Sequence, residues 1–121
     1  MKFCVPIRLP SLANMRSSWR VVRLKKRQKT ATFACMRKMM ESATLPSLPL
    51  VITITRIGPR RLDDDNLAAA CKYVRDQIAA IVGTDDGSSQ YTWQYHQRIG
   101  EYGVEVDIQP RAYFRAAYHS G

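Results

Sequence analysis

Alternating hydrophobic and polar positions predict a strand at the start of the chain. Over residues 3–9 every second side chain is apolar, and these positions are Phe3, Val5, Ile7 and Leu9. A period of two is typical of a strand with one face buried and the other exposed. Pro6 has no backbone N–H to donate, so we expect this strand to lie at an edge of its sheet.

Three later segments repeat the same period. Residues 48–57 are rich in β-branched side chains and carry the strongest strand pattern in the chain. Residues 91–99 place three aromatic side chains on one face, and residues 103–109 place three aliphatic side chains on one face. Gly100 and Gly103 flank the turn between these two strands, so we expect them to form a hairpin.

A long helix is predicted over residues 14–42, which contain neither Pro nor Gly; two shorter helices are the alternative. Its expected apolar face consists of Trp19, Val22, Phe33, Met36 and Met40. This stripe is interrupted between Lys25 and Lys29, where we expect the helix to leave the core.

A second helix is predicted over residues 66–82. Apolar side chains recur there at helical spacing, at Leu67, Ala70, Cys71, Val74, Ile78 and Ile81. Asp65 or Asn66 suits the N-cap position, because a short side-chain oxygen there accepts a hydrogen bond from an unpaired backbone N–H. Gly83 suits the position that follows the last turn.

Together these elements predict one mixed α/β domain, with a mixed sheet of about four strands packed with two helices. A chain of 121 residues holds one core of ordinary size. Hydrophobic residues at 45% and charged residues at 24% are typical of a globular protein. We therefore assign residues 1–121 to a single domain and expect residues 111–121 to form a loose, basic and aromatic tail.

Several classes of protein do not fit the sequence. No run of 18 or more apolar residues occurs, so we expect no membrane-spanning helix. Arg8 interrupts the apolar start of the chain too early for a signal peptide, and a cytoplasmic protein is expected. The three cysteines are widely spaced and the two histidines are far apart, which argues against a disulfide framework or a zinc site.

Positive charge is concentrated in the first third of the chain. The net charge is +9, and no acidic residue precedes Glu41. Seven basic residues lie between positions 16 and 29, namely Arg16, Arg20, Arg23, Lys25, Lys26, Arg27 and Lys29. Such a block attracts polyanions and releases counterions from phosphates, so nucleic acid is the expected partner and these residues its contacts. An anionic membrane surface or a merely solvated helix face are the alternatives.

Half of the ten acidic residues form two tight groups, at positions 63–65 and 85–86. Adjacent carboxylates repel one another unless a cation lies between them. Oxygen ligands without a neighbouring His or Cys favour Mg²⁺, with Mn²⁺ as a substitute. Asp63 and Asp65 point to the same side if their stretch is extended, and whether Asp86 joins them depends on the fold. The structural alternative is a helix N-terminus followed by a turn.

The run from Arg60 to Leu67, which reads Arg-Arg-Leu-Asp-Asp-Asp-Asn-Leu, is followed after a helix by Asp85-Asp86 at the head of a strand. This pattern resembles the Asp-x-Asp-Asn-Leu and Asp-Asp motifs of the RusA family of Holliday junction resolvases, often carried by phages and prophages. The chain length is also similar, as is an N-terminal strand that ends in Leu-Pro with Asn14 shortly after it. The resemblance covers most of the chain, and only the aspartate pattern is specific.

The resemblance implies a fold, an activity and a set of residues. RusA-type enzymes are mixed α/β homodimers that cut four-way junctions in the cytoplasm of bacterial or phage-infected cells, with Mg²⁺ and no small-molecule cofactor. Carried over position by position, the catalytic carboxylates and metal ligands are Asp63, Asp65 and Asp86. By the same likeness Asn14, Arg60 and Arg61 join the expected DNA contacts. Related branched DNA is an expected substrate as well.

One position departs from the family pattern. The family has an essential lysine four residues after the second Asp of its motif, where this chain has Ala69. Lys72 lies three residues further along the predicted helix and is the candidate catalytic cation, with Arg61 and Arg75 as alternatives. The departure leaves a second function open, in which a domain of the same fold binds DNA junctions or regulates their processing without cutting them.

Overall fold

Four strands and three helices form where the hydrophobic pattern predicts ordered segments. The computed structural model describes residues 1–12, 15, 18–83 and 89–111. The strands are β1 (Lys2–Val5), β2 (Leu50–Gly58), β3 (Tyr91–Ile99) and β4 (Gly103–Pro110). The helices are α1 (Ser18–Met40), α2 (Asp64–Ala70) and α3 (Lys72–Val82). The predicted mixed α/β domain with a four-stranded sheet is confirmed, and the described residues contain one helix more than expected.

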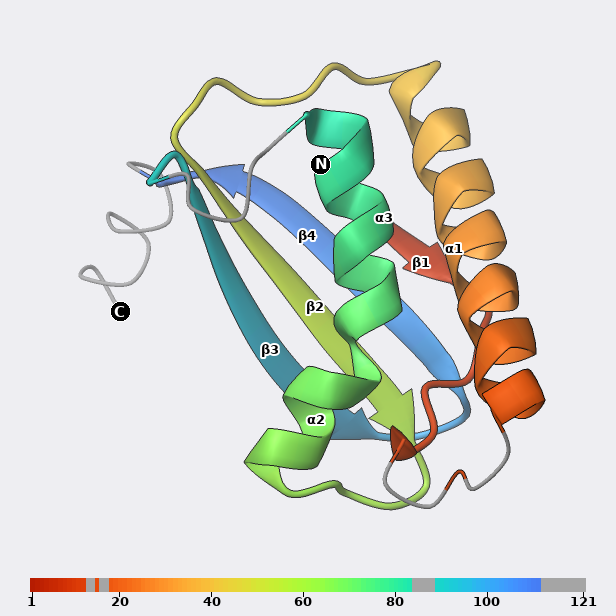
Figure 1. Cartoon of the computed structure of the whole chain (residues 1–121). Helices are drawn as coiled ribbons and strands as arrows, with labels where there is room; N and C mark the ends of the chain where they lie inside the picture. Colours follow the sequence, from red (N-terminus) through yellow and green to blue (C-terminus); the bar gives the residue numbers. More distant parts are fainter. Residues whose placement is uncertain (13–14, 16–17, 84–88, 112–121) are drawn as a thin grey trace.

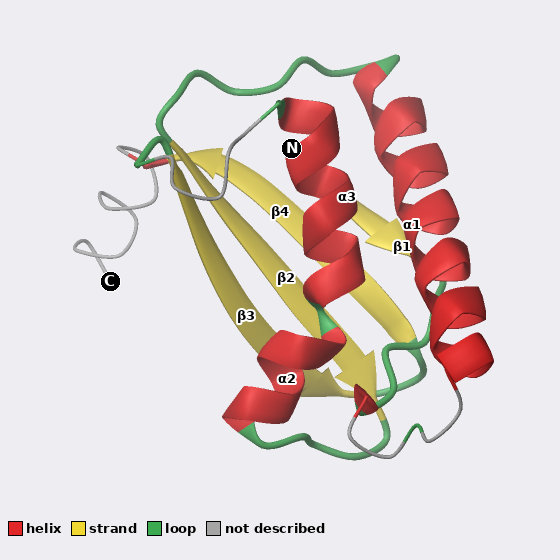
Figure 2. Cartoon of the chain, in the orientation of Figure 1, coloured by secondary structure: helices red, strands yellow, loops and turns green. Residues whose placement is uncertain are grey.

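The strands make one mixed sheet in the order β1-β4-β2-β3. β4 is antiparallel to both of its neighbours, and β3 is parallel to β2 in a register that pairs Leu50 with Tyr91 and Gly58 with Ile99. All three helices cover the same face of the sheet (Figures 1 and 2). β1 lies at an edge, as Pro6 predicts, and it ends one residue before that proline.

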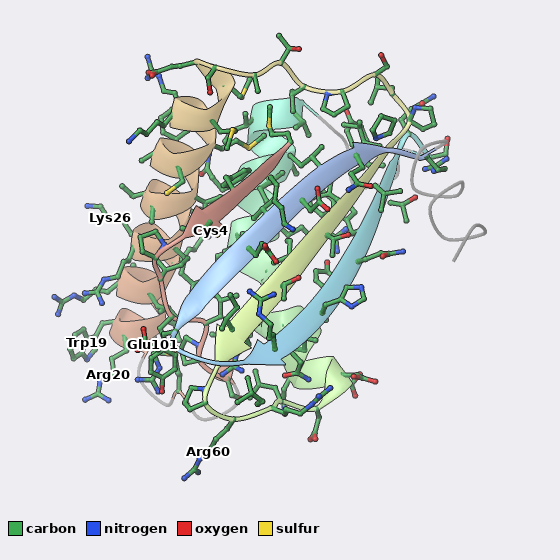
Figure 3. The ribbon with its side chains drawn as sticks, turned by 180° about the vertical axis from the view of Figure 1, so that it is seen from behind. Cys4, Trp19, Arg20, Lys26, Arg60 and Glu101 are labelled. Carbon is green, nitrogen blue, oxygen red and sulfur yellow. The ribbon has the colours of Figure 1, made fainter. Side chains whose placement is uncertain are left out.

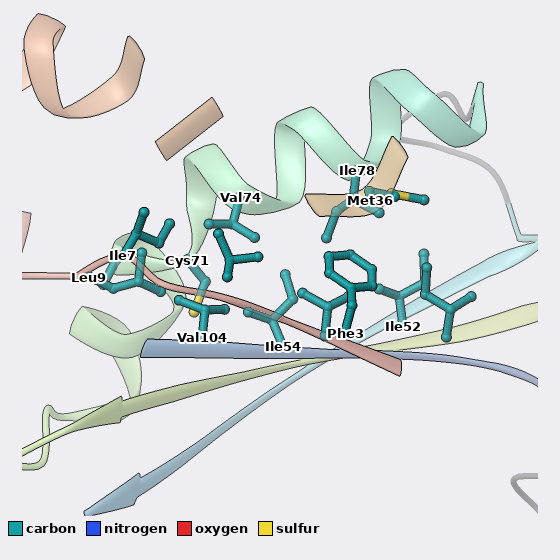
Figure 4. Packing of buried hydrophobic residues seen from close by; sticks show 14 of the residues in the cluster. Phe3, Ile7, Leu9, Met36, Ile52, Ile54, Cys71, Val74, Ile78 and Val104 are labelled. Carbon is teal, nitrogen blue, oxygen red and sulfur yellow. The ribbon is translucent and has the colours of Figure 1, made fainter. Parts of the chain in front are cut away.

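The hydrophobic core lies between the sheet and the helices. Ile52 and Ile54 of β2 are fully buried there, in one cluster with Ile78 of α3 and Met36 of α1 (Figure 4). Burial of a side chain of this size contributes about 1.5–3 kcal/mol. No described element covers the opposite face of the sheet, which carries polar side chains such as Thr53 (Figure 3).

The alternation over residues 3–9 continues beyond the strand itself. β1 ends at Val5, yet Ile7 and Leu9 are also buried. Side chains from α1 and β2 make hydrogen bonds to the backbone of this segment. Gln28 Nε2 donates to Arg8 O at 3.1 Å, and the buried guanidinium of Arg56 donates through Nε to Leu9 O at 2.8 Å.

The expected hairpin between the third and fourth strands is wrong. β3 and β4 lie on opposite sides of β2, and residues 100–102 cross the end of β2 to connect them. The crossing is close, because Gly100 donates its N–H to Gly58 O at 3.0 Å and a Cβ at Gly100 would lie 3.0 Å from Ile57. Consecutive strands are usually neighbours, and nothing in the local pattern reveals that a third strand lies between these two.

The buried face of α1 differs from the predicted one. Four of the five predicted residues are exposed, namely Trp19, Val22, Phe33 and Met40. The fifth predicted residue, Met36, is buried as expected. The other buried side chains of the helix are Gln28 and Thr32, and the three follow one another at four-residue spacing. The helix therefore stays on the core between positions 25 and 29. The Thr32 hydroxyl donates to Gln28 O at 2.7 Å, so a polar side chain is buried there without losing its hydrogen bond.

The predicted helix over residues 66–82 is two helices that meet in a bend at Cys71 (Figure 1). The first begins earlier than expected: its N-cap is Asp63 rather than Asp65 or Asn66, and the Asp63 side chain makes no capping hydrogen bond. The apolar stripe continues through the bend without Gly or Pro, which is why the pattern predicts a single helix. After the bend, α3 packs beside α1, whereas α2 contacts β3.

The second half of this helical region ends as the sequence predicts. Gly83 follows α3 with a φ of 76°, a left-handed conformation that glycine adopts without a steric penalty. Within the part of the chain that the structure describes, no helix is long and apolar enough to cross a membrane.

Candidate metal centre and nucleic-acid interface

The loop between β2 and α2 presents the acidic motif, residues 63–65, and two side chains of the sheet hold this loop. Gln97 of β3 accepts the Leu62 N–H through Oε1 at 2.8 Å and donates through Nε2 to Leu62 O at 2.7 Å. Arg56 of β2 donates through Nη1 to Arg60 O at 2.7 Å. The start of α2 is therefore fixed to the sheet by directional hydrogen bonds, which specify one backbone position more sharply than apolar contact does.

Asp63 and Asp65 follow directly on this loop. Asp63 has an extended backbone, and its carbonyl oxygen accepts the Leu67 N–H at 2.7 Å to start the helix. Asp65 lies in the first turn, and both carboxylates are exposed. Among the described residues, neither forms an ion pair within 4.0 Å. The partly positive N-terminus of α2 favours both carboxylates, so a purely structural role at the start of the helix also fits. Both carboxylates are accessible to a cation from solution.

Asp86 lies outside the described residues, and the elements on either side of it end far from the acidic motif. α3 leads away from α2 over 11 residues, or about 16 Å. β3 starts beside Leu50 at the beginning of β2, whereas α2 follows the end of β2 (Figure 1). The nine residues of β2 span about 30 Å. A meeting of Asp86 with Asp63 and Asp65 within one chain stays a prediction, and this placement of the flanking elements does not favour it.

The acidic motif supplies only part of the donor set that a metal ion requires. Among the described residues, no three His, Cys, Asp or Glu side chains gather closely enough to hold an ion. Asp63 and Asp65 nevertheless supply two carboxylates, the hard oxygen donors that Mg²⁺ prefers. Mg²⁺ usually keeps several waters and binds through one or two carboxylates together with substrate phosphates. The pair therefore fits one part of a Mg²⁺ site that a phosphate and a further carboxylate complete.

A cavity of about 920 Å³ is lined by part of the loop that leads to the acidic motif, with Pro59, Arg60 and Leu62 in its wall. Five arginines line it, namely Arg8, Arg20, Arg27, Arg56 and Arg60, and the described lining contains no acidic residue. Three of these arginines are DNA contacts that the sequence predicts. Arg20 and Arg60 extend from the same end of the molecule (Figure 3). We call this feature the arginine cavity.

Arg56 occupies a position that strand alternation assigns to the core. Its side chain is only 5% exposed, in the same row of β2 as Ile52 and Ile54. The guanidinium also lies near the bend between α2 and α3. Burial raises the pKa of the Cys71 thiol to about 12, although the positive charge of Arg56 acts in the opposite direction.

Basic residues of α1 also lie around two aromatic rings, of which Trp19 is exposed and Tyr73 is half-buried. The guanidinium carbons of Arg20 and Arg23 lie 5.8 and 5.4 Å from the centroid of the Trp19 ring. Lys25 Nζ lies 5.8 Å from the centroid of Tyr73 on α3. An exposed aromatic ring between cations suits stacking with nucleic-acid bases. Of the remaining predicted contacts, Lys26 and Arg61 are exposed, Lys29 is half-buried, and Asn14 and Arg16 lie outside the described residues.

The candidates for the catalytic cation differ in their surroundings. Lys72 is exposed at the first residue of α3, immediately after the bend. Arg75 donates through Nη1 to the Tyr95 hydroxyl at 2.9 Å, and its guanidinium lies 5.1 Å from the centroid of Trp93. Arg75 is therefore engaged with β3, while Lys72 and Arg61 have the exposure that a contact with substrate requires.

Four residues of this region were missed by sequence reasoning, namely Arg8, Gln28, Arg56 and Gln97. A signal existed for two of them. Arg56 follows Ile52 and Ile54 in an otherwise apolar row, and Gln97 follows an aromatic row that includes Trp93. A polar side chain at a core-facing strand position is the informative exception to burial of apolar residues.

Comparison with known proteins finds no family model, no curated protein and no solved structure that matches this chain.

Proposed function

We propose that the protein is a Mg²⁺-dependent endonuclease of the RusA type, which resolves four-way DNA junctions and related branched DNA by phosphodiester hydrolysis. Its expected setting is the cytoplasm of a bacterial or phage-infected cell. One observation carries the proposal: the exposed residues Asp63 and Asp65 follow directly on Leu62, which lines a cavity together with five arginines. Metal-assisted cleavage of DNA requires carboxylates for the cation and basic groups for the phosphate backbone.

The residues of the chain divide this work. Asp63 and Asp65, with Asp86 as the third expected ligand, hold the metal ion. When bound, Mg²⁺ supplies stabilisation of the negative charge that develops on the phosphate and lowers the pKa of water. Arg61 and Lys72 are exposed near the acidic motif in sequence and stabilise charge on the same phosphate by charge-assisted hydrogen bonds.

We also propose that the active species is a homodimer. Two-fold symmetry gives two equivalent sites, which suits paired incisions in a junction that itself has two-fold symmetry. The acidic motif and the elements that flank Asp86 lie at opposite ends of the sheet. Two subunits in antiparallel arrangement therefore combine Asp63 and Asp65 of one chain with Asp86 of the other.

Cleavage of a labelled synthetic four-way junction tests the proposal, with a linear duplex as the DNA control. Wild-type protein should make paired cuts in the junction with Mg²⁺ and none with EDTA. Asp65→Asn should lower the cleavage rate on the order of 10²–10³-fold, because one preorganised electrostatic contact to the transition state is removed. Junction binding should persist.

Asp64→Asn is the matched control, since it removes an adjacent exposed carboxylate from the same turn, at a position where the family tolerates other residues. It should cut at close to the wild-type rate. Cleavage by Asp65→Asn at the wild-type rate, or cleavage in EDTA, would refute the proposed centre.

The second candidate is a domain that binds junctions without cutting them. Ala69 at the family's lysine position favours it, and so does the bend that separates Lys72 from α2. This candidate predicts junction binding as tight as that of an active enzyme, with no cuts in either Mg²⁺ or Mn²⁺. Restoring cleavage with Ala69→Lys would then identify the missing cation as the cause.

A further inference from the structure

The arginine cavity differs from an ordinary basic surface because one of its guanidiniums is buried. Arg56 is 5% exposed and donates to two backbone oxygens, Leu9 O and Arg60 O. No carboxylate of the described residues lies within 4.0 Å of it. A buried charge normally has a counterion, because desolvation is otherwise costly. Arg56, which is part of the cavity lining, therefore favours an anion from outside the chain.

The other arginines that line the cavity come from separate parts of the chain. Arg8 follows β1, Arg20 and Arg27 belong to α1, and Arg60 follows β2. The planar guanidinium fork matches the oxygens of a phosphate and binds them in pairs. All four are exposed, so a phosphate that enters between them meets donors from several directions.

The cavity is much larger than a phosphate group requires. Its volume of about 920 Å³ falls within the roughly 300–1,000 Å³ of sites that bind whole small molecules. Much of its wall is apolar, with Ile7, Leu24, Pro59 and Leu62 among the lining residues. Such a wall does not contribute to phosphate binding, but it suits the flat apolar faces of a nucleobase.

Two polar groups in the wall add specific features. Tyr102 lies at the cavity with its ring centroid 4.7 Å from the guanidinium carbon of Arg8. Gln28 is 1% exposed, donates through Nε2 to Arg8 O and has no hydrogen-bond partner at Oε1 within the described chain. A buried amide oxygen without a donor is costly, and the N–H group of a base is a suitable donor.

We propose that the arginine cavity binds one unstacked nucleotide of a DNA strand, with its phosphate on the arginines and its base against the apolar wall. The inference deepens the proposed function and rests on it for the choice of DNA as ligand. A paired base inside a duplex cannot enter a concave site of this kind, whereas a base displaced at a branch point can. The cavity thus recognises the unpaired nucleotide that distinguishes branched DNA from linear duplex.

Binding measured in EDTA tests this inference without any dependence on cleavage. The probe is a fluorescent single-stranded oligothymidylate, followed by anisotropy, with dTMP and inorganic phosphate as competitors. Arg27→Gln and Arg20→Gln remove cavity arginines that are exposed on α1. Arg37→Gln is the matched control, because it removes the same charge from an exposed site in the last turn of that helix. Arg56→Lys keeps the buried charge but removes the guanidinium fork.

Arg27→Gln and Arg20→Gln should each weaken oligonucleotide binding about tenfold or more, the range of a lost hydrogen bond to a charged group. Arg37→Gln should weaken it less than about threefold, through long-range charge alone. Competition by dTMP should exceed that by inorganic phosphate, because only dTMP carries a base. Arg56→Lys, if it folds, should weaken competition by both, because both use the guanidinium fork. The α1 variants keep the test decisive if it does not.

Three results would overturn the inference. Equal losses in Arg27→Gln and Arg37→Gln would mean that the cavity is only part of a diffuse basic surface. Equal competition by phosphate and dTMP would remove the role of the base. Tighter binding of free dTMP than of the oligonucleotide would assign the cavity to a small molecule rather than to DNA. If the variants and competitors behave as expected but the protein never cuts DNA, the inference about the cavity is supported and the proposed nuclease function is refuted.

Discussion

Gln97 makes two hydrogen bonds to the backbone of Leu62, which we call the Leu62 clamp. Replacing Gln97 by Met tests whether this clamp positions the acidic motif. Met has a similar length and keeps the side chain on the helix-facing side of β3, but it can neither accept from Leu62 N–H nor donate to Leu62 O. The two hydrogen bonds, of 2.8 and 2.7 Å, are therefore lost together. A net contribution of about 0.5–1.5 kcal/mol for each bond gives an expected destabilisation of about 1–3 kcal/mol. Leu62 is half-buried, so water partly replaces the bonds and the lower half of that range is expected.

Urea unfolding measures this loss, and hydrogen exchange of the Leu62 amide locates it. The exchange rate should rise at Leu62 and at the start of α2, while the amides of β2 keep their protection. Gln94→Met is the matched control, since Gln94 lies on the same strand and faces the uncovered side of the sheet. Junction cleavage should fall in Gln97→Met more than in Gln94→Met, because Leu62 loses its hydrogen bonds to the sheet and Asp63 is the next residue. Equal stability losses in the two variants, with an unchanged Leu62 exchange rate, would refute the clamp.

Three further predictions follow from other parts of the molecule. In native protein at neutral pH a thiol reagent should modify exposed Cys4 rapidly and leave Cys71 unmodified, because burial raises the Cys71 pKa to about 12; mass spectrometry of the labelled peptides checks this. Desolvation raises the pKa of Glu105, but hydrogen bonds and charges of its basic neighbours outweigh it, so the folded-state pKa is lowered from 4.5. The resulting stability is present above pH 4.5 and is lost as the pH falls through the lowered pKa, so the unfolding free energy of Glu105→Gln should fall less than that of wild type over this acid range. Asp65→Asn and Asp86→Asn, each cleaving far more slowly than wild type when alone, should regain nicking of one junction strand when they are unfolded and refolded together, because one site of the mixed dimer is then intact; a mixture that cleaves no faster than either variant alone would place each site within one chain.

The elements of the fold were predictable wherever a residue's burial follows from its neighbours in sequence. The alternation over residues 48–57 gives β2, and Gly83 marks the end of α3. The path from β3 to β4 was not predictable, since it depends on β2 lying between them and leaves no local mark beyond two glycines. The face of α1 was mispredicted because hydrophobicity favours Trp19 and Phe33, while the register of the helix on the sheet buries Gln28 instead.

The candidate site was predictable in part for the same reason. Asp63 and Asp65 form a local cluster, so the sequence alone places them at a strand-to-helix junction, and the structure has them there. The arginine cavity combines segments that follow β1, form α1 and follow β2, and no spacing rule relates positions so far apart. Only the arginine within the apolar row of β2 offered a hint, because a buried guanidinium needs a reason that local pattern does not supply.

The order of strands in the sheet has a consequence for how the protein is made. β1 pairs with β4 through residues such as Phe3 and Val106, so the strand of this sheet that is synthesised first pairs with the one that is synthesised last. β4 also separates β1 from β2, and neither contact can form before residues 103–110 are outside the exit tunnel. Until then the apolar faces of both earlier strands lack their neighbour, which is the condition under which nascent chains aggregate or engage chaperones. The sheet should therefore be completed only after β4 has emerged, and chains stalled before β4 should be held by chaperones rather than released as partly folded domains.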